Sequence, residues 1–371
     1  MVVVRKTYKF RLYPTKAQET RMERGLELCR IVYNRTLEAR KTAYEERGET
    51  LSKYTLNNML PAWKQECPEL KGVFSQTLQE VQERVDLAFK HFFRRVKNGE
   101  VPGYPRFKGK GWYDSFTYPQ MGFKLNGNML YLSKVGDVRI KLHRPVVGNV
   151  KRATITRSSC NKWYASLTVE SDNIKVISKS VNPAVGVDMG LASFATLSNG
   201  VKIDNPRFFR IEERRLARMQ RKLSKIEKGS PQRRKAIKVV QKVHERISNK
   251  RCDFAHQLSH KLVSEYGFIS FEDLNIKVMV RNHCLAKSIS DAAWRMLITA
   301  TRYKAASAGT TVVMVNPANT SQLCSRCGQL VKKELTDRTH ECPTCGLVMD
   351  RDQNAAVNIL RLGLQSVAVK A

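Results

Sequence analysis

Three acidic residues lie far apart in the sequence, and each sits at the edge of a short element. Asp188 ends the apolar run Ala184-Val-Gly-Val187, and Glu272 ends the run Phe268-Ile-Ser-Phe271. Both runs have the length and composition of buried strands. Asp352 shortly precedes a segment rich in alanine and leucine, which favours a helix. Two strand ends and a helix start can bring three carboxylates together.

A cluster of three carboxylates is a ligand set for hard cations. Mg²⁺ prefers oxygen ligands, and a pair of ions can clamp the attacking and leaving oxygens of a phosphodiester. The three negative charges repel one another, so such a cluster destabilises the folded protein unless cations bind to it. One aspartate at a strand end is more often a cap or turn residue. The set of three therefore indicates a two-metal site for Mg²⁺, with Mn²⁺ as a substitute.

Four of the nine cysteines form two pairs with metal-ligand spacing. Cys324-Ser-Arg-Cys327 and Cys342-Pro-Thr-Cys345 are separated by 14 residues, and a glycine follows each pair. Four thiolates satisfy a tetrahedral Zn²⁺ and leave no open position, so this zinc is structural. The other cysteines are scattered, which argues against a disulfide framework. A zinc ribbon alone also occurs in transcription and translation factors.

The charge balance indicates the class of partner. The 371 residues carry 66 lysines and arginines against 33 acidic residues, a net charge of +33. So many positive charges repel one another unless a polyanion is near. Nucleic acid is the expected partner, because neutralising its phosphates releases counterions and so favours binding. No apolar run approaches the roughly 20 residues of a membrane helix, so we expect an intracellular protein without a membrane partner.

The acidic motifs resemble those of a known nuclease core. Gly186-Val-Asp-Met-Gly190, Ser270-Phe-Glu-Asp-Leu274 and Asp350-Arg-Asp-Gln-Asn-Ala-Ala356 are similar to the three motifs of RuvC-type nucleases. With a four-cysteine cluster before the third motif, nearly the whole chain resembles the OrfB/TnpB family of insertion-sequence proteins, relatives of compact CRISPR nucleases. The resemblance implies that Asp188, Glu272 and Asp352 hold the catalytic metals. Asp352 is preferred to Asp350 because it directly precedes the x-Asn-Ala-Ala run.

The first half of the chain alternates between strand and helix patterns. Residues 2–13 alternate as a strand, and Thr15 with Gln18 forms a capping box that opens a helix. Asn126-Gly127 is typical of a hairpin turn. Helices are expected at 16–47, 56–66 and 76–97, and strands at 123–125, 129–133, 138–142, 153–157 and 162–170.

The second half combines strands with a basic helical region. Residues 172–183 are expected to form a linker, and 191–197 a second strand after Asp188. Gly229-Ser-Pro231 divides the basic stretch 207–251 into two helices. The helix is expected to continue over 253–266, and another helix is expected at 290–307 and a strand at 310–315.

The resemblance gives these elements a multidomain architecture of the α+β and α/β classes. It implies a β-barrel wedge domain (1–14 plus 105–180), a helical recognition insert (15–104), an RNase H-like, RuvC-like nuclease domain (181–320 plus 349–371) and a zinc ribbon (321–348).

Three groups of residues are candidates for nucleic-acid contact. The loop 99–111 interleaves basic and aromatic side chains, which suits phosphate contact and base stacking, although a solvated linker also fits. A basic helix with few acids predicts a phosphate track, although a solvated face is the usual alternative. The candidates are Tyr104, Arg106, Phe107, Lys108 and Lys110 in the loop, Arg214, Arg218 and Arg221 in the helix, and Arg326 in the ribbon.

The resemblance implies an RNA-guided DNA endonuclease encoded by a transposable element. It would take a guide RNA from its own locus and cut double-stranded target DNA beside a short flanking motif, in the cytoplasm at the nucleoid of a prokaryote. A transposase acting without RNA and a nuclease-silent guided DNA-binding protein remain alternatives. A structural RNA-binding protein would not explain the acids. Monomer and homodimer both stay open.

Overall fold

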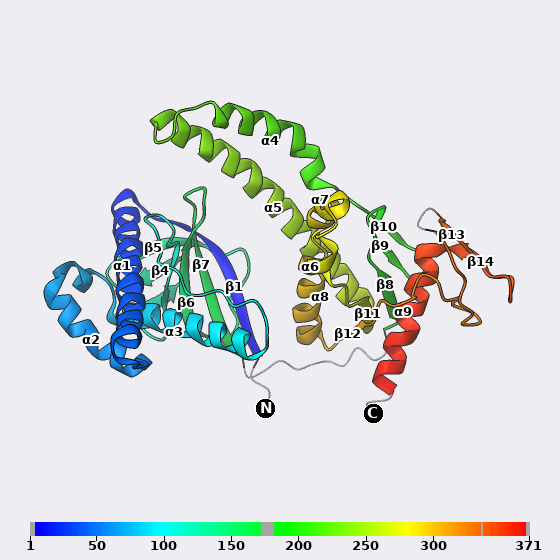
Figure 1. Cartoon of the computed structure of the whole chain (residues 1–371), viewed down its shortest axis with the longest axis horizontal. Coiled ribbons are helices and arrows are strands. Elements are labelled where there is room, and N and C mark those ends of the chain that lie inside the picture. The colour runs from blue at the N-terminus through cyan, green and yellow to red at the C-terminus, as the bar shows by residue number, and fades with distance from the viewer. Residues whose placement is uncertain (1–3, 172–181, 335–336, 369–371) are drawn as a thin grey trace. The chain divides into compact units, whose positions relative to one another are not determined.

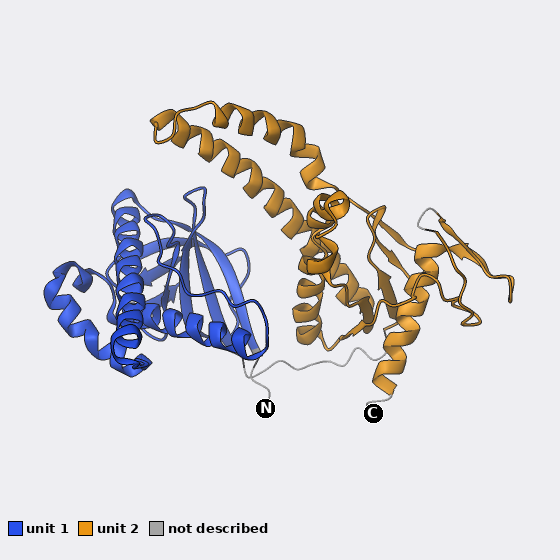
Figure 2. Ribbon diagram, in the orientation of Figure 1, with its two compact units in different colours: residues 1–174 blue, residues 175–371 orange. Residues whose placement is uncertain are grey.

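The computed structural model describes residues 4–171, 182–334 and 337–368. The chain divides into two compact units, residues 1–174 and 175–371 (Figure 2). Most of the expected linker, residues 172–181, lies outside the described residues. Within the described ranges, no helix is both long and apolar enough to span a membrane.

The first unit contains a nearly closed, barrel-like sheet of seven antiparallel strands (Figure 1). Their order is β2-β6-β7-β1-β5-β4-β3. The alternation predicted for the first strand is confirmed, since Tyr8, Phe10 and Leu12 are buried. The short strand β2 was not predicted, because four residues are too few to show a period and β2 lacks the hairpin turn that marks β3 and β4. The strands are β1 Val4–Tyr13, β2 Ser115–Tyr118, β3 Phe123–Asn126, β4 Met129–Leu132, β5 Gly136–Lys141, β6 Asn149–Arg157 and β7 Trp163–Ser171.

The helices of the first unit are inserted between β1 and β2. The capping box is present, because Thr15 Oγ1 accepts from Gln18 N at 3.3 Å and Gln18 Oε1 accepts from Thr15 N at 3.0 Å. In α3, the apolar side chains Leu78, Val81, Val85 and Phe89 are buried in the core, whereas Val96 near its end is 51% exposed. The helices are α1 Lys16–Arg47, α2 Lys53–Glu66, the 3₁₀ turn η1 Pro68–Gly72 and α3 Ser75–Lys97.

The second unit is built on a mixed sheet of five strands in the order β10-β9-β8-β11-β12. The central strand β8 pairs in parallel with β11 and antiparallel with β9. β12 continues the parallel part, and β10 continues the antiparallel part. The strands are β8 Ala184–Asp188, β9 Ser193–Leu197, β10 Lys202–Asp204, β11 Phe268–Glu272 and β12 Thr311–Val315.

Helices cover both faces of this sheet (Figure 1). Leu262 of α5 and Leu297 of α8 belong to one core cluster with β-strand residues such as Val187 and Phe271. The predicted helix 290–307 is wrong in one respect: it is two helices, separated at Ala293, whose φ of 55° is left-handed. The helices are α4 Phe208–Ser224, α5 Pro231–Glu265, α6 Ile276–Met279, α7 His283–Ala292, α8 Trp294–Ala308 and α9 Arg351–Ala368.

Helix α9 lies directly on the backbones of β8 and β11, on the face opposite α5 and α8. A Cβ atom at Gly186 would lie 2.0 Å from the carbonyl oxygen of Ala356, and one at Gly363 would lie 2.4 Å from Ser270 Oγ. Ser270 Oγ also donates a hydrogen bond to the carbonyl oxygen of Ile359 at 2.9 Å. The two glycines therefore fix how closely α9 approaches the sheet.

This packing predicts that Gly186→Ala destabilises the second unit by about 3 kcal/mol, because backbone atoms of α9 cannot move aside as a flexible side chain can. The measurement is thermal or urea unfolding of the whole chain. Gly25→Ala in α1 is the control, since a Cβ there meets nothing within 4 Å. A Gly186→Ala protein as stable as the control would contradict this account of the packing.

Candidate active site and metal centre

Strand alternation places two of the three acids on the face that α9 covers. Side chains two apart on a strand share a face. Asp188 therefore shares the face of Gly186, and Glu272 that of Ser270. β8 and β11 run in parallel, and Phe271 lies opposite Val187. Both acids therefore lie at the carboxyl-terminal ends of neighbouring strands. Asp352 lies in the first turn of α9, which crosses that face.

 The carboxylates are close enough to affect one another. Asp188 is half-buried, and Glu272 is 6% exposed. Burial first, and then the charges of Glu272 and Asp352, raise the pKa of Asp188 well above its usual value. The three carboxylates therefore form one electrostatic cluster.

Glu272 is oriented by a hydroxyl group from the segment that follows β12. Thr320 Oγ1 donates to Glu272 Oε1 at 2.5 Å, and both residues are buried. Burial raises the pKa of Glu272, and the hydrogen bond from Thr320 opposes this rise. The hydroxyl therefore favours the ionised form, which is the form that binds a cation.

Asp350 and Asp352 have different surroundings. Asp350 Oδ1 accepts from the backbone N–H groups of Asp352 and Gln353, each at 3.1 Å, and so caps α9. Its other oxygen pairs with Lys202 Nζ at 2.7 Å. Burial alone would raise the pKa of Asp350, but these partners lower it. Asp352 contacts Arg351 Nε at 3.3 Å. Asp350 is thus used as a cap, which supports Asp352 as the third acid of the cluster.

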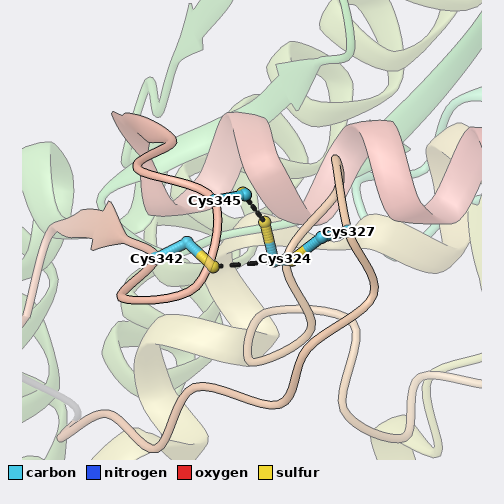
Figure 3. A group of neighbouring side chains, drawn as sticks. All are labelled: Cys324, Cys327, Cys342 and Cys345. Carbon is cyan, nitrogen blue, oxygen red and sulfur yellow. Dashed lines mark hydrogen bonds between the residues drawn. The ribbon is translucent and has the colours of Figure 1, made fainter.

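The four cysteines form the other candidate metal site. All four sulfur atoms lie within 4.8 Å of one another. Among the described residues, no other group of three or more His, Cys, Asp and Glu side chains is gathered this tightly, and the three carboxylates are farther apart than the four thiols. Figure 3 shows Cys324 facing Cys345 and Cys327 facing Cys342, with Sγ–Sγ distances of 3.5 and 3.6 Å. The arrangement fits tetrahedral Zn²⁺.

The two cysteine turns have the same backbone geometry. Gly328 N donates to the carbonyl oxygen of Cys324, and Gly346 N to that of Cys342, each at 2.9 Å. Both glycines have a positive φ, of 77° and 69°, which side chains disfavour. A hydrogen bond from the backbone of Cys345 lowers the pKa of the Cys342 thiol to about 6, so its ligand form is present at neutral pH.

Two buried asparagines of α9 hold the start of the cysteine segment. Asn354 Oδ1 accepts from Ser325 N at 2.9 Å, and Asn354 Nδ2 donates to the carbonyl oxygen of Leu323 at 2.7 Å. Asn358 Nδ2 donates to the carbonyl oxygens of Leu323 and Thr320, at 2.7 and 2.9 Å. The segment that orients Glu272 is therefore fastened to the helix that carries Asp352. The hairpin of β13 Thr339–Glu341 and β14 Val348–Asp350 leads back into that helix.

The loop candidates for nucleic-acid contact are held against the helices of the first unit. Asn34 of α1 accepts from Lys108 N at 2.8 Å and donates to its carbonyl oxygen at 3.0 Å. Tyr104 packs edge-on against Phe89 and Phe92. Lys108 is half-buried, whereas the others are exposed: Tyr104, Arg106, Phe107 and Lys110.

The other candidates lie in the second unit. Arg214, Arg218 and Arg221 are exposed on α4, at a spacing that places them along one side of the helix. Leu216, on the buried side, packs against Val243 of α5. Arg326 is exposed between the first two cysteines. All of these side chains can reach a ligand from solvent.

Sequence reasoning missed Thr320, Asn354 and Asn358 as site residues. A threonine in a loop has no signal of its own, since its partner Glu272 lies 48 positions away. The two asparagines carried a weak signal, because an amide four residues after another on an apolar helix calls for a buried partner.

Comparison with known proteins gives the fold and the family. A solved chain in a cryo-EM structure of a Cas12f1–sgRNA–target DNA complex aligns with a TM-score of 0.58 at 14% identity, covering 96% of this chain and 98% of that one. The chain therefore has the same fold as the Cas12f1 protein in that complex. Family models match residues 166–283 (OrfB_IS605, probable transposase), 294–359 (Cas12f1-like, TNB domain) and 1–49 (helix-turn-helix domain).

Two relatives are similar over nearly the whole chain. A protein of Streptomyces pristinaespiralis named "Putative RNA-guided DNA endonuclease" is 37% identical, over 99% of this chain and 92% of its own. InsQ of Escherichia coli (strain K12), with the same description, is 34% identical, over 96% and 92%. The chain belongs to the OrfB/TnpB family, as its motifs predicted. Residues 4–49 form one strand and a single long helix, although the model matched there is described as helix-turn-helix.

The cysteine geometry predicts one equivalent of zinc per chain, measured by elemental analysis of the purified protein. Cys342→Ser should remove most of it and destabilise the second unit, because three thiolates hold the ion less well. Cys284→Ser is the control, since this exposed cysteine lies outside the group. Full zinc content in Cys342→Ser would contradict the assignment of the ligands.

Proposed function

We propose that the protein is an RNA-guided DNA endonuclease of a transposable element, which cuts DNA complementary to its guide RNA beside a short flanking motif. One observation carries the chemistry: Asp188 and Glu272 lie at the same ends of the parallel strands β8 and β11, and Asp352 lies in the first turn of α9, which packs on both strands. Membership of a family whose relatives are named as RNA-guided DNA endonucleases supports the substrate and the guide.

The chemistry is metal-dependent hydrolysis of a phosphodiester bond. Two Mg²⁺ ions, when bound, would stabilise the attacking and leaving oxygens, and Mn²⁺ could replace them. Asp188 and Glu272 offer their carboxylates from strand ends, and Asp352 offers a third from α9. Thr320 fixes the direction of one Glu272 oxygen. The structural Zn²⁺ would be held by Cys324, Cys327, Cys342 and Cys345 and would take no part in the reaction.

The domains implied by the resemblance divide this work. The sheet and α9 of the second unit would be the RuvC-like nuclease domain (181–320 plus 349–371), with the zinc ribbon (321–348) as a target-binding insert. The barrel (1–14 plus 105–180) and the helical insert (15–104) would hold the guide RNA and read the flanking motif. Base pairing between guide and target would supply the sequence specificity.

A transposase is the second candidate, because the matching family model is described as a probable transposase. Such a protein would join DNA strands at the ends of its element and would be indifferent to RNA. Cleavage that depends on a matching guide RNA separates the two functions.

The carboxylate assignment predicts that Asp188→Asn and Asp352→Asn each lower guided DNA cleavage by about 10³-fold or more and leave RNA binding intact, because each removes a metal ligand. Asp350→Asn is the matched control. Asparagine caps a helix as well as aspartate does, and the lost pair with the half-exposed Lys202 is worth at most about 1 kcal/mol. Equal losses in Asp350→Asn and Asp352→Asn would contradict the choice of Asp352.

The hydroxyl of Thr320 has a separate expected effect. Thr320→Val should lower the cleavage rate about tenfold and raise the Mg²⁺ concentration needed for half-maximal rate, because Glu272 loses its buried donor. Thr320→Ser keeps the hydroxyl and should retain activity. Zinc content and unfolding temperature serve as controls for a purely structural effect. If the valine and serine variants cut equally fast, Thr320 does not position Glu272.

A further inference from the structure

A basic cavity of about 610 Å³ lies in the second unit. Its lining includes the arginines Arg207, Arg210 and Arg338 and the apolar side chains of Leu191 and Leu285. Its size falls in the range of small-ligand sites. The function proposed above assigns no role to it.

The acidic residue in the wall, Asp291, is already neutralised. It is 5% exposed and pairs with Arg251 Nη2 at 2.7 Å. Its oxygens also accept hydrogen bonds from Phe209 N at 2.9 Å and Arg210 N at 3.3 Å. These bonds give partners to backbone N–H groups in the first turn of α4 that the helix itself leaves unpaired. The arginines that face the cavity therefore give it a positive charge.

Two of these arginines have uncommitted guanidinium groups. Arg210 pairs with Glu213 at 3.1 Å, but within the described ranges Arg207 and Arg338 have no side-chain hydrogen bond or ion pair, and both are exposed. Arg207 also has a left-handed φ of 46°, a conformation that costs a non-glycine residue about 1 kcal/mol or more. Its N–H donates to Asn205 Oδ1 at 3.2 Å, and Asn205 Nδ2 donates to the carbonyl oxygen of Leu191 at 3.0 Å. The strained turn thus holds Arg207 in the cavity wall.

The cavity adjoins the carboxylates by two routes along the chain. Leu191 is three residues after Asp188, so their Cα atoms lie within roughly 11 Å. On the other side, the carbonyl oxygen of Arg338 accepts from Arg351 N at 2.8 Å, and Arg351 directly precedes Asp352. A polymer that reaches the carboxylates can therefore also reach the cavity.

We propose that this cavity binds a backbone phosphate of the single DNA strand being cut, with Arg207 and Arg338 as its ligands. Guanidinium groups bind phosphate oxygens through paired hydrogen bonds, and the apolar wall suits a sugar or base. The phosphate would be a neighbour of the scissile one, and its capture would set the register of the strand. This inference rests on the proposed function.

The test neutralises the phosphates of the target strand one at a time. Methylphosphonates are placed at each position flanking the mapped cut, and single-turnover cleavage by the guide-loaded protein is measured. We expect one non-scissile position at which neutralisation slows the wild type about tenfold. Arg207→Gln and Arg338→Gln should slow cleavage similarly with the unmodified strand and lose most of the sensitivity at that position. Arg302→Gln, an exposed arginine of α8 outside the cavity lining, should keep the wild-type pattern.

Unchanged sensitivity at every position in Arg207→Gln and Arg338→Gln would overturn the inference while leaving guided cleavage standing. If the wild type cuts no target, the proposed function fails, and the cavity is tested by binding of single-stranded DNA and RNA of one sequence to the full chain. In that assay each variant should weaken DNA binding and lower the slope of log affinity against log salt by about 0.7. Losses confined to RNA would identify an RNA backbone as the occupant and overturn the claim for DNA.

Discussion

The site depends on the close seating of α9 against the backbones of β8 and β11. Gly186 and Gly363 leave room for this contact, and the hydrogen bond from Ser270 to the carbonyl of Ile359 fixes it. Because Asp352 lies in the first turn of α9, the seating of the helix sets the position of that carboxylate relative to Asp188 and Glu272. The three acids come from segments far apart in the chain, so backbone packing is what makes them one site.

The same helix connects the acidic cluster to the zinc-binding segment. Asn354 and Asn358 hold the backbone of residues 320–325, and Thr320 in that segment donates to Glu272. A buried amide or hydroxyl group without a hydrogen bond destabilises the folded state, so these partners favour this one arrangement of the segment. The cysteine cluster thereby stabilises the loop that orients a carboxylate, although it takes no part in the proposed chemistry.

The sequence predicted the parts of the site that carry local signals. Asp188 and Glu272 follow apolar runs of strand length, and the cysteine spacing and following glycines predict the turns that form. The break at Ala293 was missed, because a left-handed alanine is imposed by tertiary packing rather than by its own preference. The roles of Thr320 and Arg207 were missed for a similar reason, since each depends on partners from other segments. The domain boundaries stay predictions.

Guidance by RNA is tested most directly by purifying the protein from cells that carry its native locus and sequencing the RNA that remains bound. A guided nuclease should carry one discrete RNA, transcribed from the sequence beside the gene. Heterogeneous cellular RNA, or no RNA, would contradict a guided nuclease and favour a protein that recognises DNA directly.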